Sequence, residues 1–149
     1  MHKKMSSVIR LTALLLAIVL AIPSFVSASA AEAVQPRASA YLTSYCAYVY
    51  LPGDGEVRVY FDVTGTGYLD EIGALSIQIH ESIDGTIWTW KDTFKHYLTP
   101  GMLSYNDDLH AGYVSYDGIR GRYYKAYVCI WGGKDGDGDT RYFWTSVKH

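Results

Sequence analysis

Three carboxylates at alternate positions near the C-terminus are the residues whose type and spacing point most directly to chemistry. Asp135, Asp137 and Asp139 are separated by single glycines. Such alternation in a glycine-rich loop lets several oxygens converge on a hard cation, so Ca²⁺ is the candidate cofactor. An EF-hand-type loop requires glycine where Thr140 stands and glutamate where Ser146 stands. The alternative interpretation is a solvated hairpin tip that needs no cofactor.

Catalytic signatures do not occur in the sequence. It has no Gly-x-Ser-x-Gly and no P-loop, and the run 80–84 (His-Glu-Ser-Ile-Asp) lacks the second histidine of a zincin helix. The acid pairs 70–71 and 107–108 are adjacent in sequence, so their side chains diverge along an extended chain. The sequence therefore predicts a protein that is not an enzyme.

Residues 1–30 predict a signal peptide. A basic start precedes an apolar run over 11–22, Pro23 follows, and 28–30 reads Ala-Ser-Ala. A transmembrane helix needs about 20 apolar residues, which is longer than this run. We expect cleavage after residue 30, with 31–33 (Ala-Glu-Ala) as a second site, and a secreted, extracellular chain without a membrane anchor.

The charge balance bears on the partners. The chain has 13 Lys and Arg against 15 Asp and Glu, and removal of residues 1–30 takes away three basic residues and no acid, which changes the formal charge from −2 to −5. This argues against nucleic acid and anionic membranes as partners. All 14 Tyr and all 4 Trp lie in the remaining chain, which indicates a packed domain.

Two cysteines, Cys46 and Cys129, are present in a chain predicted to enter an oxidising compartment, and an even count there favours a disulfide. A bridge across so long a loop could contribute about 4 kcal/mol in the chain-entropy model. The alternative is two unpaired, partly buried thiols.

The segment 31–40 is small and polar and predicts a flexible leader, and period-two runs begin at Tyr41. Turn residues recur about every ten positions, the pattern of an antiparallel all-β domain over 41–149. About seven strands favour a two-sheet sandwich over a barrel. The predicted strands are 43–51, 57–63, 75–81, 88–94, 113–116, 123–131 and 141–147.

The segment 121–130 resembles the penultimate strand of fibronectin type III and immunoglobulin-like domains, in which a tyrosine hydrogen-bonds back to the preceding loop. Tyr124 would be that tyrosine, with small or branched residues at 126, 128 and 130. The segment 81–88 resembles the S-x-D-G-x-x-W hairpin of secreted bacterial sandwiches. Ala126 stands where antibody domains have a cysteine, so the chain departs from that group.

From residue 36 to residue 141 the chain also resembles an uncharacterised family of small exported proteins of Gram-positive, Clostridia-like bacteria. That family has no assigned function, so the resemblance implies export and fold and provides no active site.

Strand alternation places aromatic side chains outward on two predicted strands. If Cys46 pairs with Cys129, these aromatics share one outer face, which could stack on sugar rings. The alternative is that cross-strand tyrosine pairs only stabilise the sheet. The candidate binding residues are Tyr48, Tyr50, Tyr123, Tyr127 and Trp131.

The sequence therefore predicts a secreted, non-catalytic β-sandwich that binds carbohydrate or a cell-surface component. One alternative is a structural or antagonistic secreted protein that acts on other proteins or cells. A cryptic hydrolase is the other.

Overall fold

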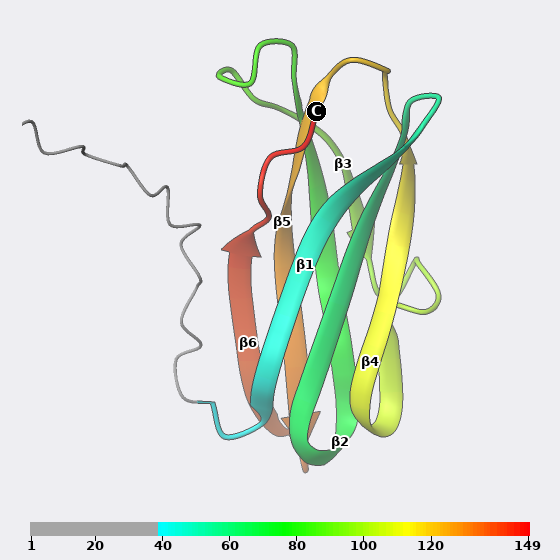
Figure 1. Cartoon of the computed structure of the whole chain (residues 1–149). Coiled ribbons are helices and arrows are strands. Elements are labelled where there is room, and N and C mark those ends of the chain that lie inside the picture. Colours follow the sequence, from blue (N-terminus) through cyan, green and yellow to red (C-terminus); the bar gives the residue numbers. More distant parts are fainter. Residues whose placement is uncertain (1–38) are drawn as a thin grey trace, which may run out of the picture. The chain divides into compact units, whose positions relative to one another are not determined.

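The computed structural model describes residues 39–149, so the predicted signal peptide (1–30) and nearly all of the leader (31–40) lie outside the described residues. This part is all-β, and it contains no helix that could cross a membrane. Its strands are β1 (Leu42–Gly53), β2 (Glu56–Ser82), β3 (Thr89–Lys95), β4 (Leu103–Asp117), β5 (Tyr123–Lys134) and β6 (Asp137–Trp144) (Figure 1).

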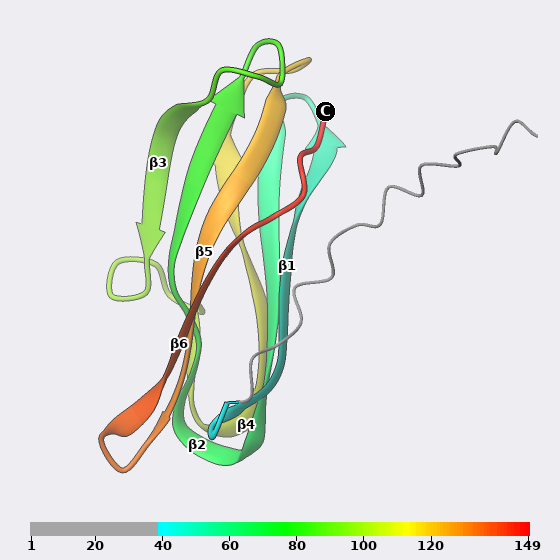
Figure 2. The ribbon, with the colours of Figure 1, turned by 90° about the vertical axis from the view of Figure 1, so that its left-hand side faces the viewer.

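The 27-residue strand β2 organises the sheet. Its first half pairs with β1 and β4, its second half pairs with β3 and β5, and β6 pairs with β5, always antiparallel. We call β1, residues 56–64 of β2 and residues 109–117 of β4 the first arm. The second arm is β3, residues 76–82 of β2, β5 and β6. The sheet curls between the arms, so that β1 and β3 lie at opposite sides of Figure 2.

The core lies on the inner side of the curl. The predicted alternation is confirmed on β2, where Val57, Val59, Phe61 and Val63 are all buried. It is also confirmed on β5, where the alternate positions from Tyr124 to Ile130 are buried. Each of the valine, isoleucine and phenylalanine side chains among them contributes about 1.5–3 kcal/mol when it leaves water. The two apolar inner faces therefore account for most of the hydrophobic stabilisation.

The antiparallel all-β prediction is confirmed, but the count of seven strands is wrong. The predicted strands 57–63 and 75–81 are two halves of β2, and hydrogen bonds join all six strands into one curled sheet in place of two separate sheets. The segment 64–74, which lies between those two predicted strands, contains three glycines. It continues the strand instead, because register shifts at 64–69 and 74–76 bend the ladder without breaking it.

The predicted glycine-rich loop near the C-terminus is shorter than expected. Only Asp135 and Gly136 form the turn between β5 and β6, with φ angles of 54° and 80°. Two residues with positive φ suit the twist of a tight hairpin. Asp137 and Asp139 are therefore strand residues of β6, and their side chains are directed by the ladder.

Candidate functional site

The three aspartates of the candidate calcium site do not converge. Asp139 accepts a hydrogen bond from the hydroxyl of Ser39, and Asp137 accepts one from the hydroxyl of Tyr41 at 3.1 Å. The bond from Ser39 is the main cause that lowers the pKa of Asp139. Asp135 lies apart in the turn, and residues 39–149 contain no cluster of three potential metal ligands. The carboxylates of β6 instead fasten the chain that leads into β1.

The predicted disulfide is absent, because both cysteines are free in the described part of the chain. Cys46 is exposed on the outer side of the first arm, opposite Asp62. Cys129 is buried on the outer side of the second arm, between Ser76 and Tyr142. The core separates these two surfaces. Burial is the main cause that raises the pKa of each thiol.

We expect the folded protein to carry two thiols that differ in access. Cys46 should react with a thiol reagent within minutes at pH 8, whereas Cys129 should react only on unfolding, because its side chain is buried. Intact-mass analysis after timed alkylation measures both rates, and the variant Cys46→Ser reports Cys129 alone. If the protein reacted with the thiol reagent only after treatment with a reducing agent, its cysteines would be paired, and this would contradict the structure.

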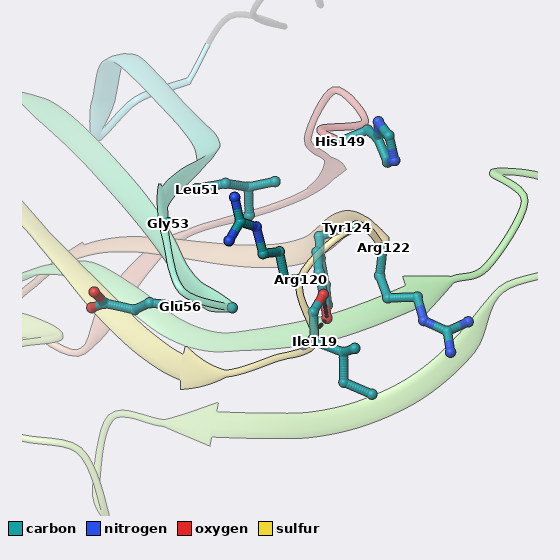
Figure 3. A pocket seen from close by; sticks show the side chains of 10 residues that line it. Leu51, Gly53, Glu56, Ile119, Arg120, Arg122, Tyr124 and His149 are labelled. Atoms are coloured by element: carbon teal, nitrogen blue, oxygen red, sulfur yellow. Dashed lines mark hydrogen bonds between the residues drawn. The ribbon is translucent and has the colours of Figure 1, made fainter.

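A small pocket of about 170 Å³ lies beside the β1–β2 turn, and Arg120, Arg122 and His149 are among its lining residues. Two arginines could clamp an anion only if both guanidinium groups faced the same point. In Figure 3 the side chains of Arg120 and Arg122 extend in opposite directions. The pocket therefore has no convergent donor pair.

Tyr124, which also lines this pocket, has a structural role. Its hydroxyl donates to Glu81 at 2.7 Å and accepts the N–H of Ile119 at 2.6 Å, so the hydrogen bond to the preceding loop is confirmed. Glu81 also pairs with Lys91 at 3.1 Å. Burial alone would raise the pKa of Glu81, but the donors Tyr124 and Lys91 outweigh burial and hold that pKa below its usual value. The buried carboxylate stays ionised as part of the fold.

The first arm carries a row of tyrosines across its outer side. Tyr60 on β2 lies opposite Tyr48 of β1 and Tyr113 of β4. Its ring centroid is 5.2 Å from each of theirs, and its plane is nearly parallel to that of Tyr48. Tyr50 meets Tyr60 edge-on at 6.3 Å. Tyr48 and Tyr113 are 51% and 55% exposed, so about half of each ring is open to solvent. We call Tyr48, Tyr50, Tyr60 and Tyr113 the tyrosine face.

A groove of about 400 Å³ runs beside the tyrosine face. The neighbouring row consists of shorter side chains, Cys46, Asp62 and Ala111, which lie opposite one another in the ladder. Three rings of the tyrosine face and the carboxylate residue Asp62 line this groove together. An aromatic wall with a carboxylate acceptor can stack a sugar ring and accept hydrogen bonds from its hydroxyls.

The structure does not place the five predicted binding residues on one face. Tyr48 and Tyr50 belong to the tyrosine face, whereas Tyr127 lies on the second arm beside Trp144. Tyr123 stacks on His149 at 4.0 Å. Trp131 covers the β5–β6 hairpin so closely that a Cβ at Gly138 would overlap its ring. Trp131 therefore packs against the backbone of this hairpin, on the second arm, and does not belong to the tyrosine face.

Sequence reasoning missed Tyr60 and Tyr113 as members of the site. Tyr60 is readable as an outward residue, because it alternates with the apolar positions of the strand 57–63. Its partnership with Tyr113 depends on the register of β4, which no local pattern encodes.

Comparisons with known proteins leave the function open. No protein-family model matches the chain, and no curated protein matches it. Among solved structures, the chain is similar to a crystal structure of a protein from Archaeoglobus fulgidus, with 7% sequence identity and a TM-score of 0.34. The match covers 72% of this chain and 94% of that chain. So distant a likeness carries no argument, and the functional proposal depends on the residues of this chain.

Proposed function

We propose that this protein is an exported, non-catalytic binding protein that recognises neutral polysaccharide through the tyrosine face. The observation that carries the proposal is the row of three adjacent tyrosine rings beside a groove that Asp62 also lines. The C–H faces of a sugar ring suit the electron-rich faces of these rings, while its hydroxyls reach the carboxylate and water. The carboxylate would repel an anionic ligand, so a neutral sugar is favoured.

The proposal also includes a fold type for the domain and export of the protein from the cell. We infer an immunoglobulin-like or fibronectin type III-like sandwich whose two layers are the two arms of the one curled sheet. The hydrogen bond from Ile119 to Tyr124 supports this relation. Export rests on the signal-peptide pattern of residues 1–30. A place among the small exported proteins of Gram-positive bacteria rests on the sequence resemblance.

Two single substitutions test the tyrosine face. Tyr48→Ala and Tyr113→Ala should each weaken binding to a neutral polysaccharide at least tenfold, which corresponds to about 1.4 kcal/mol, because each removes a stacking surface. Affinity electrophoresis in gels that contain soluble β-glucan, xylan or mannan measures the retardation. Both rings are about half exposed, so the melting temperature should fall by only a few degrees.

The matched control is Tyr68→Ala, since Tyr68 is 69% exposed and lies outside the tyrosine face. This variant should bind like the parent. If the Tyr48→Ala and Tyr113→Ala variants fold and are retarded in the gel like the parent, the tyrosine face only stabilises the sheet. A parent protein that binds none of the three polysaccharides would also contradict the proposal.

A further inference from the structure

The outer side of the second arm carries an aromatic cluster built around one lysine. The ammonium nitrogen of Lys125 lies 4.3 Å from the ring centroid of Trp88 and 4.4 Å from that of Trp144. The ring of Tyr127 is 4.9 Å from that of Trp144. Cation–π contact fixes the lysine without neutralising its charge. We call Trp88, Lys125, Tyr127, Tyr142 and Trp144 the lysine–tryptophan face.

The charge of Lys125 has no acidic counterpart nearby. The ion pairs within residues 39–149 join Arg58 to Glu56, Lys91 to Glu81 and Arg141 to Asp139, and none includes Lys125. On the outer side, Lys125 lies in one row with His80 of β2 and Trp90 of β3. Tyr127 lies in the next row with Gln78 and Thr93. Lys95 lies in the row after that, opposite Ser76.

The nearest acidic residue of the edge strand lies on its other side. Asp92 is opposite Ile79, which is buried in the core, so Asp92 shares the inner side of the ladder. Burial and the charge of Lys125 lower the pKa of His80, so its ring is neutral at pH 7. Lys125 therefore provides an uncompensated positive charge on this face, although acidic residues outnumber basic ones in the chain. Lys95 adds a second positive charge at the edge of the face, where its ammonium nitrogen lies 5.7 Å from the ring centroid of Tyr97.

We propose that the lysine–tryptophan face is a second binding site, and that it is selective for polysaccharides that carry carboxylate or sulfate groups. The rings of Trp144 and Tyr142 are 46% and 62% exposed and can stack on the sugar. Lys125 lies between the rings of Trp88 and Trp144, where an acidic substituent of that sugar would pair with it, and Lys95 lies at the edge of the face. This site is on the other arm from the tyrosine face and does not depend on the function proposed there.

Single-stranded nucleic acid also combines negative charge with rings that stack. Its binding requires a basic groove that follows the phosphates over several nucleotides. Two lysines on a chain of net negative charge do not form such a groove. An anionic polysaccharide needs only a few charge contacts beside its stacked rings, so it is the ligand that the face fits.

The test compares ligands that share a sugar ring and differ in whether the ring carries a charged group. Polygalacturonate and its methyl ester have the same sugar ring, and dextran sulfate and dextran give a sulfated pair. We expect the parent protein to bind each anionic member at least tenfold more tightly than its neutral counterpart, with an affinity that falls as salt rises. The two pairs distinguish carboxylate from sulfate as the preferred group.

The variants assign the binding to this face. Lys125→Gln should lose at least tenfold in affinity for the anionic ligand, whereas Lys125→Arg, which keeps the charge, should remain within about threefold of the parent. Lys95→Gln, at an exposed position without an ion pair, should lose severalfold and provides a test if Lys125→Gln fails to fold. The control Lys134→Gln lies at the β5–β6 turn and should bind like the parent.

Three results would overturn the proposal. The first is that each anionic polysaccharide, polygalacturonate and dextran sulfate, binds no more tightly than its neutral counterpart. The second is that the Lys125→Gln and Lys95→Gln variants fold and bind the anionic ligand like the parent. The third is that single-stranded DNA binds more tightly than the anionic polysaccharides. The two proposed sites fail separately. Tyr48→Ala should keep the anionic ligand, and Lys125→Gln should keep the neutral one.

Discussion

Replacing Gly73 by alanine should destabilise the protein by at least about 3 kcal/mol, the largest effect that we expect from a single methyl group. Gly73 has a φ of 142°, and a Cβ there would overlap the carbonyl oxygen of Met102 and lie 2.9 Å from Cδ2 of His110. The backbone at Met102, directly before β4, cannot move aside as a side chain can. Urea unfolding followed by tryptophan fluorescence measures the loss, and the melting temperature should fall by about 10 °C or more.

Gly67→Ala is the matched control, because Gly67 lies in the same bend of β2 and nothing lies within 4 Å of the position that its Cβ would take. This variant should remain within about 1 kcal/mol of the parent. A Gly73→Ala variant as stable as the parent would mean that β4 does not approach the bend this closely. Because the bend directs the two arms apart, it also separates the tyrosine face from the lysine–tryptophan face.

Replacing Tyr124 by phenylalanine should change how stability depends on pH at the alkaline end. Burial and the neighbouring Glu81 raise the pKa of Tyr124 to about 12. The folded state therefore favours the neutral phenol, and this contribution is fully present below pH 10 and is lost as pH rises toward 12. Two pKa units correspond to about 2.7 kcal/mol. The parent should lose this amount over that range, and Tyr124→Phe should not.

At neutral pH the same substitution should cost about 1–3 kcal/mol, because Glu81 loses the hydroxyl donor and keeps only Lys91. The pKa of Glu81 is lowered in the folded state, so its contribution is present above the unfolded pKa and is lost as pH falls through the folded value. Urea unfolding between pH 2 and pH 12 measures both limbs, with Tyr68→Phe as the control. An unchanged alkaline limb in Tyr124→Phe would contradict the hydrogen-bonded geometry.

The direction of side chains along each strand could be predicted from the sequence. Val57, Val59, Phe61 and Val63 face the core as their spacing predicts. Tyr48 and Tyr50 face outward. The hydrogen bond between Tyr124 and the preceding loop also follows the resemblance. These features depend on residues close in sequence, whose relative directions are set by the extended backbone itself.

The division of β2 into two strands was the largest error in the predicted strands. Gly65, Gly67 and Gly73 lie between the two predicted strands, and glycine is common in turns. The same conformational freedom lets a strand bend at a bulge and change partners, which is its role in β2. Local sequence does not distinguish the two uses, because the difference lies in whether β4 and β5 are present to pair with the bend.

The sequence by itself determined the all-β class, the inner and outer sides of the strands and the supply of exposed aromatics. The tertiary structure alone decided which outward residues meet. It grouped Tyr48 with Tyr60 and Tyr113, separated Cys46 from Cys129, and set Trp144 beside Lys125. The physical reason is that the alternation of inward and outward side chains is a property of a single strand. Which residues become neighbours across strands depends on the register and on the bend of β2, and both are set by the burial and pairing of residues far apart in sequence.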